Sequence, residues 1–170
     1  MKRSEHGICL LLGSNIEPED NLPRAIVLLQ KHLCLIQTSS VWESRAVGSD
    51  GPNFLNAAVL ATTSLDADTL RLHLLRPLEA QLGRVRTSDK NAPRTLDIDL
   101  IIYDQKLLDP SLWKYAHLAL PVSELLPTYR SETGAYLKDF ALLAAASSGI
   151  WVRADVSDYP FSTVFSQPQY

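Results

Sequence analysis

Two aspartates stand one residue apart at the start of an apolar run, in the order Asp97-Ile98-Asp99-Leu100-Ile101-Ile102. Side chains of a strand alternate between its two faces, so a strand here places Asp97 and Asp99 on the same face. The same alternation places Ile98, Leu100 and Ile102 together on the opposite face. The two carboxylates are therefore expected to project side by side from a strand whose other face is apolar.

Two ionised carboxylates in this arrangement need a partner. At about 7 Å they repel each other by roughly 2 kcal/mol at an effective dielectric constant of about 20. A divalent cation, a proton or arginine side chains must offset this repulsion. Mg²⁺ suits the pair, because it binds one or two carboxylates and completes its shell with water and phosphate oxygens. The competing interpretation is a solvated strand face with surface Asp–Arg pairs.

A basic segment comes just before the two aspartates and carries Arg84, Arg86, Lys90 and Arg94. Arginines hold phosphate oxygens through paired hydrogen bonds, and metal ions bridge the same oxygens. A basic run alone is most often a solvated loop. Its position next to two carboxylates favours a site for a polyphosphate bound with Mg²⁺.

Asn56 lies inside an apolar segment, Phe54-Leu55-Asn56-Ala57-Ala58-Val59. Its amide offers both a donor and an acceptor, which can bind the edge of a heterocycle while Phe54, on the same face, stacks on the ring. The alternative is an amide satisfied by nearby backbone. The sequence contains no Walker A, GxGxxG, CxxC or HExxH pattern, so any nucleotide binds by another route. His32 and His73 are expected on helix surfaces, and no histidine cluster indicates zinc.

The composition is that of an ordinary globular domain, and we expect one domain over residues 1–170. The chain has 46% hydrophobic and 21% charged residues, a net charge of −3 and a pI of about 5.8. This balance argues against broad binding to nucleic acid or to anionic membranes. Cys9 and Cys34 lie in apolar runs, as buried thiols in a reducing compartment do. No apolar run is long enough for a membrane span or a signal peptide, so a cytoplasmic protein is expected.

The elements that must position these residues follow from hydrophobic periodicity. Leu22, Ala25, Ile26, Leu29 and Leu33 fall on one helical face, with Asp20 or Asn21 as the N-cap and Pro23 in the first turn. A second helix over 66–82 is expected to kink at Pro77, and a third covers 137–145. Strands are expected at 8–12, 35–42, 53–63 and 95–103, with a loop at 43–52 and a mobile loop at 84–94. This order is the split βαβ, ferredoxin-like α+β arrangement, with helices on one face of an antiparallel sheet. Residues 146–170 remain unassigned.

Four motifs together resemble the 6-hydroxymethyl-7,8-dihydropterin pyrophosphokinase (HPPK) family and span about residues 8–127. They are Leu12-Gly13-Ser14-Asn15, Phe54-Leu55-Asn56-Ala57-Ala58, Glu79 with Gly83-Arg84-Val85-Arg86, and Ala92-Pro93-Arg94-Thr95-Leu96-Asp97-Ile98-Asp99. The resemblance implies a three-layer α-β-α fold. It also implies transfer of a pyrophosphoryl group from ATP to the hydroxymethyl oxygen of the pterin, with release of AMP, in folate biosynthesis.

The resemblance assigns roles to particular residues. Asp97 and Asp99 would hold two Mg²⁺ ions along the triphosphate, while Arg84, Arg86 and Arg94 neutralise phosphate charge during attack on the β-phosphorus. No side chain is an obvious general base, and Asp97 is the closest candidate. The positions matching the ATP site are Leu72, Arg76, Glu79, Arg84, Arg86, Arg94 and Leu100. Those matching the pterin site are Ser44, Val47, Phe54, Asn56, Asp97 and His117.

The sequence departs from the family at three places. The segment after the aspartate strand is shortened to Leu112-Trp113-Lys114-Tyr115-Ala116-His117-Leu118. His117 there replaces either a phosphate-binding histidine or a phenylalanine that stacks on the pterin, and the spacing favours the stacking position. Asn91 stands where some members carry a tryptophan, and Pro77 interrupts the helix that presents Glu79.

Two other functions are weighed against an active HPPK. One is a diverged relative that acts on another pterin-like alcohol, and the other is a non-catalytic ferredoxin-like binding module. The expected partners are the small molecules ATP and 6-hydroxymethyl-7,8-dihydropterin, without nucleic acid or membrane. The sequence does not specify an oligomeric state.

Overall fold

The computed structural model describes residues 5–46, 51–89 and 92–157. In this part of the chain one antiparallel sheet has the strand order β6-β5-β1-β4-β3-β7, and β2 also pairs with β4. The strands are β1 (His6–Ser14), β2 (Cys34–Thr38), β3 (Trp42–Ser44), β4 (Phe54–Thr63), β5 (Asp97–Tyr103), β6 (Lys106–Leu107) and β7 (Trp151–Val152). The arrangement of β5, β1, β4 and β2 confirms the predicted ferredoxin-like core.

The predicted strand over 35–42 is two strands in the structure. β2 pairs with residues 59–62 of β4, and β3 pairs further along the same strand with Phe54, Leu55 and Asn56. Between them, the Ser39 hydroxyl accepts a hydrogen bond from the Ala58 amide at 2.8 Å, which occupies a backbone donor of β4. Glu43 and Ser44 therefore belong to a strand, not to the loop in which the sequence placed them.

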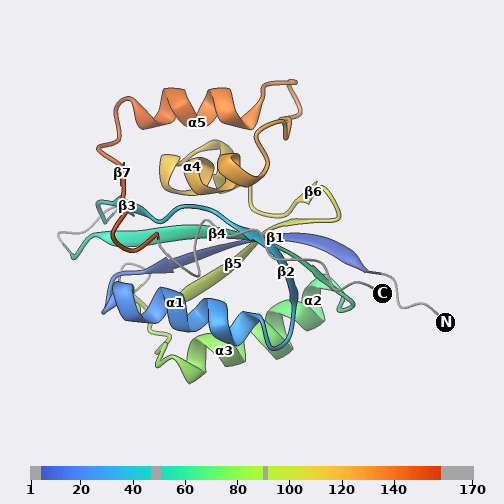
Figure 1. Ribbon diagram of the computed structural model, residues 1–170, viewed down its shortest axis with the longest axis vertical. Helices are drawn as coiled ribbons and strands as arrows, with labels where there is room; N and C mark the ends of the chain where they lie inside the picture. The colour runs from blue at the N-terminus through green and yellow to red at the C-terminus, as the bar shows by residue number, and fades with distance from the viewer. Residues whose placement is uncertain (1–4, 47–50, 90–91, 158–170) are drawn as a thin grey trace.

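Helices cover both faces of the sheet, so the expectation of one covered face was wrong and the three-layer arrangement is confirmed (Figure 1). On one face, α1 (Pro18–Leu29), α2 (Ala67–Thr69), η1 (Leu70–Leu75) and α3 (Arg76–Gln81) pack on the first apolar core. On the other face, η2 (Pro110–Trp113), α4 (Ala116–Leu125) and α5 (Leu137–Ala145) pack on the second. No helix in the described part of the chain is long and apolar enough to cross a membrane.

The helical segment after Asp66 is interrupted, as expected from Pro77, but the interruption extends over a full turn. Leu70–Leu75 is a π-helix, and Arg76 donates its backbone N–H to the Arg71 carbonyl, five residues earlier. Proline has no N–H and its ring collides with the preceding turn, so a widened turn before it relieves the clash. His73 is exposed on this turn, as predicted. Gly83 ends the segment with a φ of 81°.

Helix α1 begins earlier than predicted. Its N-cap is Glu17, with a φ of 43°, and Pro18 occupies the first helical position, where its fixed φ is favourable. Asn21 therefore lies inside the helix instead of capping it, and its side chain donates to the Ile16 carbonyl at 2.7 Å. Pro23 is likewise within the helix.

The side chains of β5 stop alternating regularly between the two faces of the sheet halfway along the strand. Ile98 and Leu100 lie in the first core, but Ile102 lies in the second, together with Ile101. The cause is a register shift opposite Cys9 and Leu10 of β1, which breaks the alternation. The prediction that Ile102 shares a face with Ile98 was therefore wrong, whereas Asp97 and Asp99 precede the irregularity.

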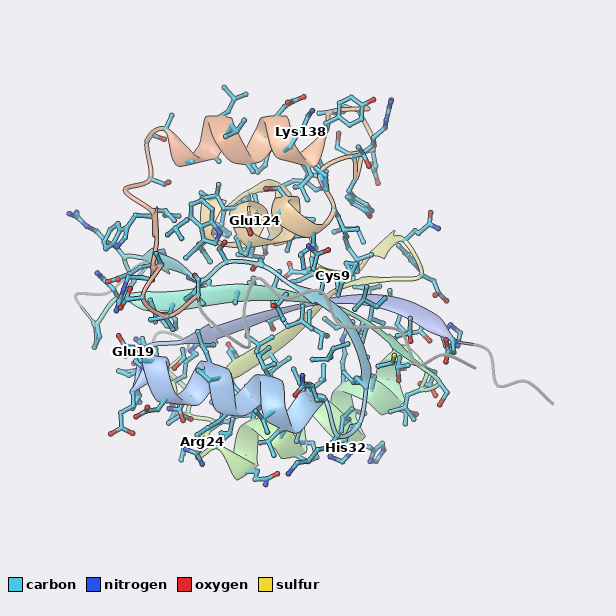
Figure 2. All side chains as sticks on the ribbon, viewed as in Figure 1. Cys9, Glu19, Arg24, His32, Glu124 and Lys138 are labelled. Atoms are coloured by element: carbon cyan, nitrogen blue, oxygen red, sulfur yellow. The ribbon has the colours of Figure 1, made fainter. Side chains whose placement is uncertain are left out.

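Helix α4 was not predicted, and it forms the layer next to the sheet on the second face. Glu124, labelled in Figure 2, joins α4 to β3, because its carboxylate accepts hydrogen bonds from Trp42 Nε1 at 2.6 Å and from the Ser40 amide at 2.8 Å. Cys9 is buried beneath this layer, where burial raises its pKa to about 12, and Cys34 is half-buried. Both thiols are free.

Candidate active site

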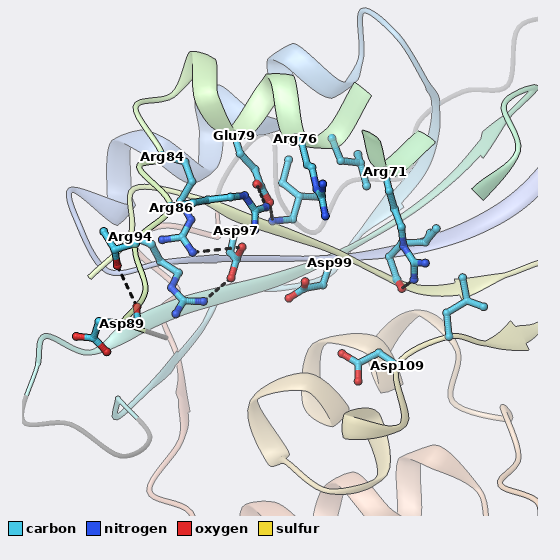
Figure 3. A pocket seen from close by; sticks show the side chains of 15 residues that line it. Arg71, Arg76, Glu79, Arg84, Arg86, Asp89, Arg94, Asp97, Asp99 and Asp109 are labelled. Carbon is cyan, nitrogen blue, oxygen red and sulfur yellow. Dashed lines mark hydrogen bonds and ion pairs between the residues drawn. The ribbon is translucent and has the colours of Figure 1, made fainter. Parts of the chain in front are cut away.

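Two cavities meet at the beginning of β5. The larger, about 500 Å³, lies between β5, the η1–α3 segment and the arginine-containing loop that follows it (Figure 3). The smaller, about 180 Å³, is enclosed by β1, β3, β4 and the start of α4. Arg94, Asp97 and Asp99 line both cavities, so a molecule in one would approach a molecule in the other at these three residues.

Asp97 is held between two arginines. Arg94 Nη1 lies 2.5 Å from Asp97 Oδ2, and Arg84 Nη2 lies 3.9 Å from Asp97 Oδ1. All three side chains are largely buried, with exposed fractions of 11–20%. The Arg84 Nε is also buried and has no hydrogen-bond partner among the described residues. Two guanidinium groups thus face the Asp97 carboxylate where the cavities join.

Unlike that of Asp97, the Asp99 carboxylate has no hydrogen bond or ion pair with the described residues, and it points into the larger cavity (Figure 3). Desolvation by the cavity walls raises its pKa to about 7, and the charges of Asp97, Asp109 and Glu79 add to this. The residue is water-accessible, so we attribute the desolvation to the concave wall around the carboxylate and not to enclosure in the core. A cation next to Asp99 would relieve this accumulation of negative charge.

The outer edge of β5 is bonded by side chains from the neighbouring helical segment. β6 pairs only at Ile102 and Tyr103, so in the described residues no strand lies beside the first half of β5 on this side. Glu79 Oε1 accepts from the Ile98 amide at 2.8 Å, and Arg71 Nη2 approaches the Leu100 carbonyl at 3.5 Å. The second Glu79 oxygen pairs with Arg86 at 2.6 Å. The cavity wall and the strand carrying the aspartates are therefore fixed to each other.

The smaller cavity has the features expected of a site for a planar heterocycle. The Asn56 side chain is buried and donates to the Ser44 hydroxyl at 3.0 Å, so its partner is another side chain and not nearby backbone. Phe54 lies on the same wall, and the Arg94 guanidinium lies 5.8 Å from its ring centroid. A Cβ at Gly13 would contact the Asn56 amide oxygen at 3.4 Å, so glycine keeps that wall open.

His117, near the start of α4, lines the smaller cavity and not the larger one. Its ring stacks on Tyr115 with centroids 5.4 Å apart and planes inclined by 27°. Burial lowers the pKa of His117, so the ring is neutral at pH 7. A flat, neutral ring at this place is suited to contact with another ring.

Asn15 connects the loops that border the two cavities. Its side-chain oxygen accepts from the Arg94 amide at 2.7 Å, and its backbone amide donates to the Arg94 carbonyl at 3.1 Å. Its side-chain amide donates to the Pro52 carbonyl at 3.3 Å. The turn after β1 thereby fixes Arg94 beside the smaller cavity.

Most of the residues singled out in the sequence lie together. The larger cavity is lined by Arg76, Glu79, Arg84, Arg86, Arg94, Asp97, Asp99 and Leu100, and the smaller by Ser44, Phe54, Asn56, Arg94, Asp97, Asp99 and His117. Leu72 lies at neither cavity: it is 47% exposed, while Arg71 and Leu75 beside it line the larger one. The predictions for Val47 and Asn91 fall outside the described residues.

Sequence reasoning missed several lining residues, and four of them are charged: Arg71, Asp89 and Asp109 in the larger cavity and Arg45 in the smaller. Arg71 lies on the π-helical turn, whose width changes which residues face the cavity. Asp109 precedes η2, and its carboxylate accepts from the Ser111 amide at 2.9 Å. An Asp-Pro pair is a helix-start signal, which identifies the cap but not its proximity to Asp99.

No group of three or more histidine, cysteine, aspartate or glutamate side chains forms a metal site in the described ranges. Two adjacent carboxylates, one of them unpaired and with a raised pKa, are nevertheless the donor set that Mg²⁺ uses when phosphates and water supply the remaining ligands. Asp97 and Asp99 therefore fit a magnesium–polyphosphate complex better than a metal held by protein alone.

The ferredoxin-like α+β fold of this chain thus carries an arginine-rich cavity that suits a polyanion beside a smaller, amide- and aromatic-lined cavity that suits a planar ring. Residues 9–127 match the model of the 7,8-dihydro-6-hydroxymethylpterin-pyrophosphokinase (HPPK) family. The chain belongs to this family.

Individual relatives carry related names. A 2-amino-4-hydroxy-6-hydroxymethyldihydropteridine pyrophosphokinase of Pseudomonas aeruginosa is 31% identical over 150 residues, covering 81% of this chain and 90% of the relative. The mitochondrial folate synthesis bifunctional protein of Arabidopsis thaliana is 30% identical over 165 residues, covering 90% of this chain. This chain spans only 29% of that protein's length. A Plasmodium falciparum HPPK-DHPS structure has a TM-score of 0.68 at 10% identity, covering 85% of this chain and 46% of its own, which establishes the likeness of fold.

Proposed function

We propose that the protein transfers the pyrophosphoryl group of ATP to the hydroxymethyl oxygen of 6-hydroxymethyl-7,8-dihydropterin and releases AMP, as a step of folate biosynthesis. The observation that carries the proposal is the sharing of Arg94, Asp97 and Asp99 between the two cavities. Transfer of one group between two bound molecules requires the reacting atoms to meet at one place. Family membership and the names of the relatives support the same activity.

In this proposal the pterin occupies the smaller cavity. Asn56 binds the polar edge of the ring, since its amide both donates and accepts hydrogen bonds. Phe54 and His117 provide flat surfaces for the ring faces, and Ser44 fixes the orientation of Asn56. The hydroxymethyl group then lies toward Asp97 and Asp99. The lining position of His117 supports its stacking role over a phosphate-binding one.

The triphosphate of ATP occupies the larger cavity. Arg84, Arg86 and Arg94, which line this cavity, neutralise phosphate oxygens. Mg²⁺ ions held by Asp97 and Asp99 would supply further neutralisation of the phosphate charge. Arg76 and Leu100, which line the same cavity, bind the rest of the nucleotide.

The chemical step forms one bond and breaks one. The pterin hydroxyl oxygen bonds to the β-phosphorus, and the bond from this phosphorus to the oxygen shared with the α-phosphate breaks. AMP leaves with that oxygen, and the hydroxyl proton passes to a carboxylate between the cavities, with Asp97 as the proposed acceptor. Because phosphoryl transfer demands little covalent assistance, positioning and charge neutralisation provide most of the rate.

The test is release of AMP from ATP and Mg²⁺ in the presence of 6-hydroxymethyl-7,8-dihydropterin, compared with other pterin alcohols and with no pterin. Dependence on the named pterin supports the proposal. Faster turnover of a different alcohol would favour the diverged relative, and ATP or pterin binding without AMP release would favour a binding module. The shared residues of the two cavities favour a catalyst over a module.

A cytoplasmic location remains a prediction from composition. One of the plant relatives is named as mitochondrial.

A further inference from the structure

We infer that Arg153, in the segment after β7, is a positioning residue for the pterin cavity, acting through Glu43. The inference rests on the proposed function, since it concerns the affinity for the pterin substrate. Arg153 lies beyond the residues matched by the family, which end at 127. The proposed role therefore falls in the C-terminal segment, to which the sequence analysis assigned no function.

The segment containing Arg153 folds back along β3. β7 pairs with β3 through Val152 and Trp42, and the Arg153 amide donates to the Val41 carbonyl at 2.8 Å. The Val41 amide in turn donates to the Ser157 hydroxyl at 2.9 Å. These bonds fix the backbone of residues 151–157 against β3, a strand of only three residues.

The Arg153 side chain connects three separate parts of the chain. Its Nη1 donates to Glu43 of β3 at 2.7 Å, its Nη2 lies 3.3 Å from Glu19 of α1, and Nε and Nη2 both bond Asp155 at 2.8 Å. Hydrogen bonds to Asp155 and Glu43 raise the pKa of Arg153, so it is always charged. Glu19, labelled in Figure 2, lies in the first turn of α1.

Glu43 passes this constraint to both ends of the loop that borders the pterin cavity. Its second oxygen accepts from Asn53 Nδ2 at 2.9 Å, so one carboxylate binds Arg153 on one side and Asn53 on the other. Burial alone would raise the pKa of Glu43, but hydrogen bonds from Asn53 and Arg153 outweigh it and lower the pKa. Ser44 and Phe54 line the cavity, and Glu43 and Asn53 directly precede them in the chain.

As a consequence, the end of β3 and the start of β4 are held at a fixed spacing beside the cavity. Ser44 pairs with Phe54 and Trp42 pairs with Asn56 in the β3–β4 register, so a shift of Glu43 moves the residues that hold the ring edge and the ring face. Without the Arg153 guanidinium, the Glu43 carboxylate keeps only its bond to Asn53, and β3 is then held to the C-terminal segment by backbone pairing alone. The larger cavity is lined by other elements and is expected to keep its affinity for ATP.

The test compares Arg153→Gln with the unsubstituted chain of 170 residues in the AMP-release assay. We expect the KM for the pterin to rise about tenfold, with kcat and the KM for ATP within about twofold of wild type. Glu43→Gln should give a similar rise, and the double variant no more than the larger single effect, because both changes break the same connection. A structural role alone would lower Tm and the active fraction without raising the pterin KM.

Asp155→Asn is the matched control, because it weakens another contact of the same guanidinium and leaves the pair with Glu43. An unchanged pterin KM in this variant supports the inference, whereas a rise equal to that of Arg153→Gln contradicts it. If Arg153→Gln does not fold, Arg153→Lys and Glu43→Gln provide the comparison. An active wild type with an unchanged pterin KM in the Arg153 and Glu43 variants overturns this inference alone. A wild type that neither releases AMP nor binds the pterin overturns the proposed function and this inference with it.

Discussion

Glu79, on α3, accepts a hydrogen bond from the backbone amide of Ile98, on β5, at 2.8 Å. The Glu79 side chain is 3% exposed, and Ile98 lies between the two aspartates of the site. Replacing Glu79 by Ala leaves this amide buried without a partner. We expect Glu79→Ala to lower the free energy of unfolding by about 2–3 kcal/mol, measured by urea denaturation.

Glu79→Gln serves as the control for that variant. The glutamine oxygen can still accept from Ile98, while the charge paired with Arg86 is lost. Desolvation raises the pKa of Glu79, so the neutral side chain also removes an unfavourable burial of charge. We expect stability within about 1 kcal/mol of wild type, and a loss as large as that of Glu79→Ala would mean that the ion pair, not the bond to β5, dominates.

Asp99→Asn should abolish turnover and preserve the fold. The Asp99 carboxylate has no hydrogen bond or ion pair with the described residues, so the change removes a charge without breaking a side-chain contact and leaves the pairing with β1 in place. Loss of one electrostatic group at a phosphoryl-transfer site costs about a hundredfold or more in kcat. AMP release with Mg²⁺ and both substrates measures this, alongside a thermal melt. Near-normal activity would refute the magnesium assignment, and Asp139→Asn on α5 is the remote control for the loss of a carboxylate.

The raised pKa of Asp99 predicts a pH dependence of stability in protein freed of metal by a chelator. The folded state holds the proton up to about pH 7, whereas the unfolded state releases it near its ordinary value of 3.8. The contribution of Asp99 to stability is therefore complete below pH 4 and lost as the pH rises to about 7. The Tm of Asp99→Asn should match wild type at pH 4 and exceed it at pH 8. A Tm difference that is the same at both pH values would contradict the raised pKa.

His117→Ala should weaken the pterin more than ATP. The ring lines the smaller cavity and stacks on Tyr115, so its removal takes away a flat surface but no phosphate contact. We expect the pterin Kd to rise about tenfold, since a ring–ring contact is worth about 1 kcal/mol beyond its buried area. Separate titrations with the pterin and with ATP distinguish the roles. A larger change for ATP would assign His117 to phosphate, and His32→Ala, exposed after α1, is the control.

The order of strands and helices around the site could be predicted from periodicity, because each of those elements has one apolar face. Helix α4 could not, since Leu118, Ala119, Leu120 and Val122 are all buried and leave no polar face to define a period. Pro121 inside it also argues against a helix. The face of the sheet on which Ile102 lies depends on a register shift between β5 and β1. This shift arises from the pairing of two distant strands, so the alternation within one segment cannot predict it.

The site was predictable where its residues share a strand and less so where the fold brings them together. Asp97 and Asp99 needed only the two-residue repeat of β5. Arg71 and Asp109 reach the same cavity from a π-helical turn and from the start of η2, which no sequence spacing connects. The link between Arg153 and Glu43 joins residues 110 positions apart, so the sequence pattern could not indicate it.

An uncovered strand edge is a template on which another molecule can extend a sheet, and such edges promote aggregation. The first half of β5 avoids this, because the Ile98 donor and the Leu100 acceptor are already occupied by Glu79 and Arg71. We therefore expect substitutions of Glu79 or Arg71 that are chosen to alter nucleotide binding to lower solubility as well, because each frees a backbone group at this edge.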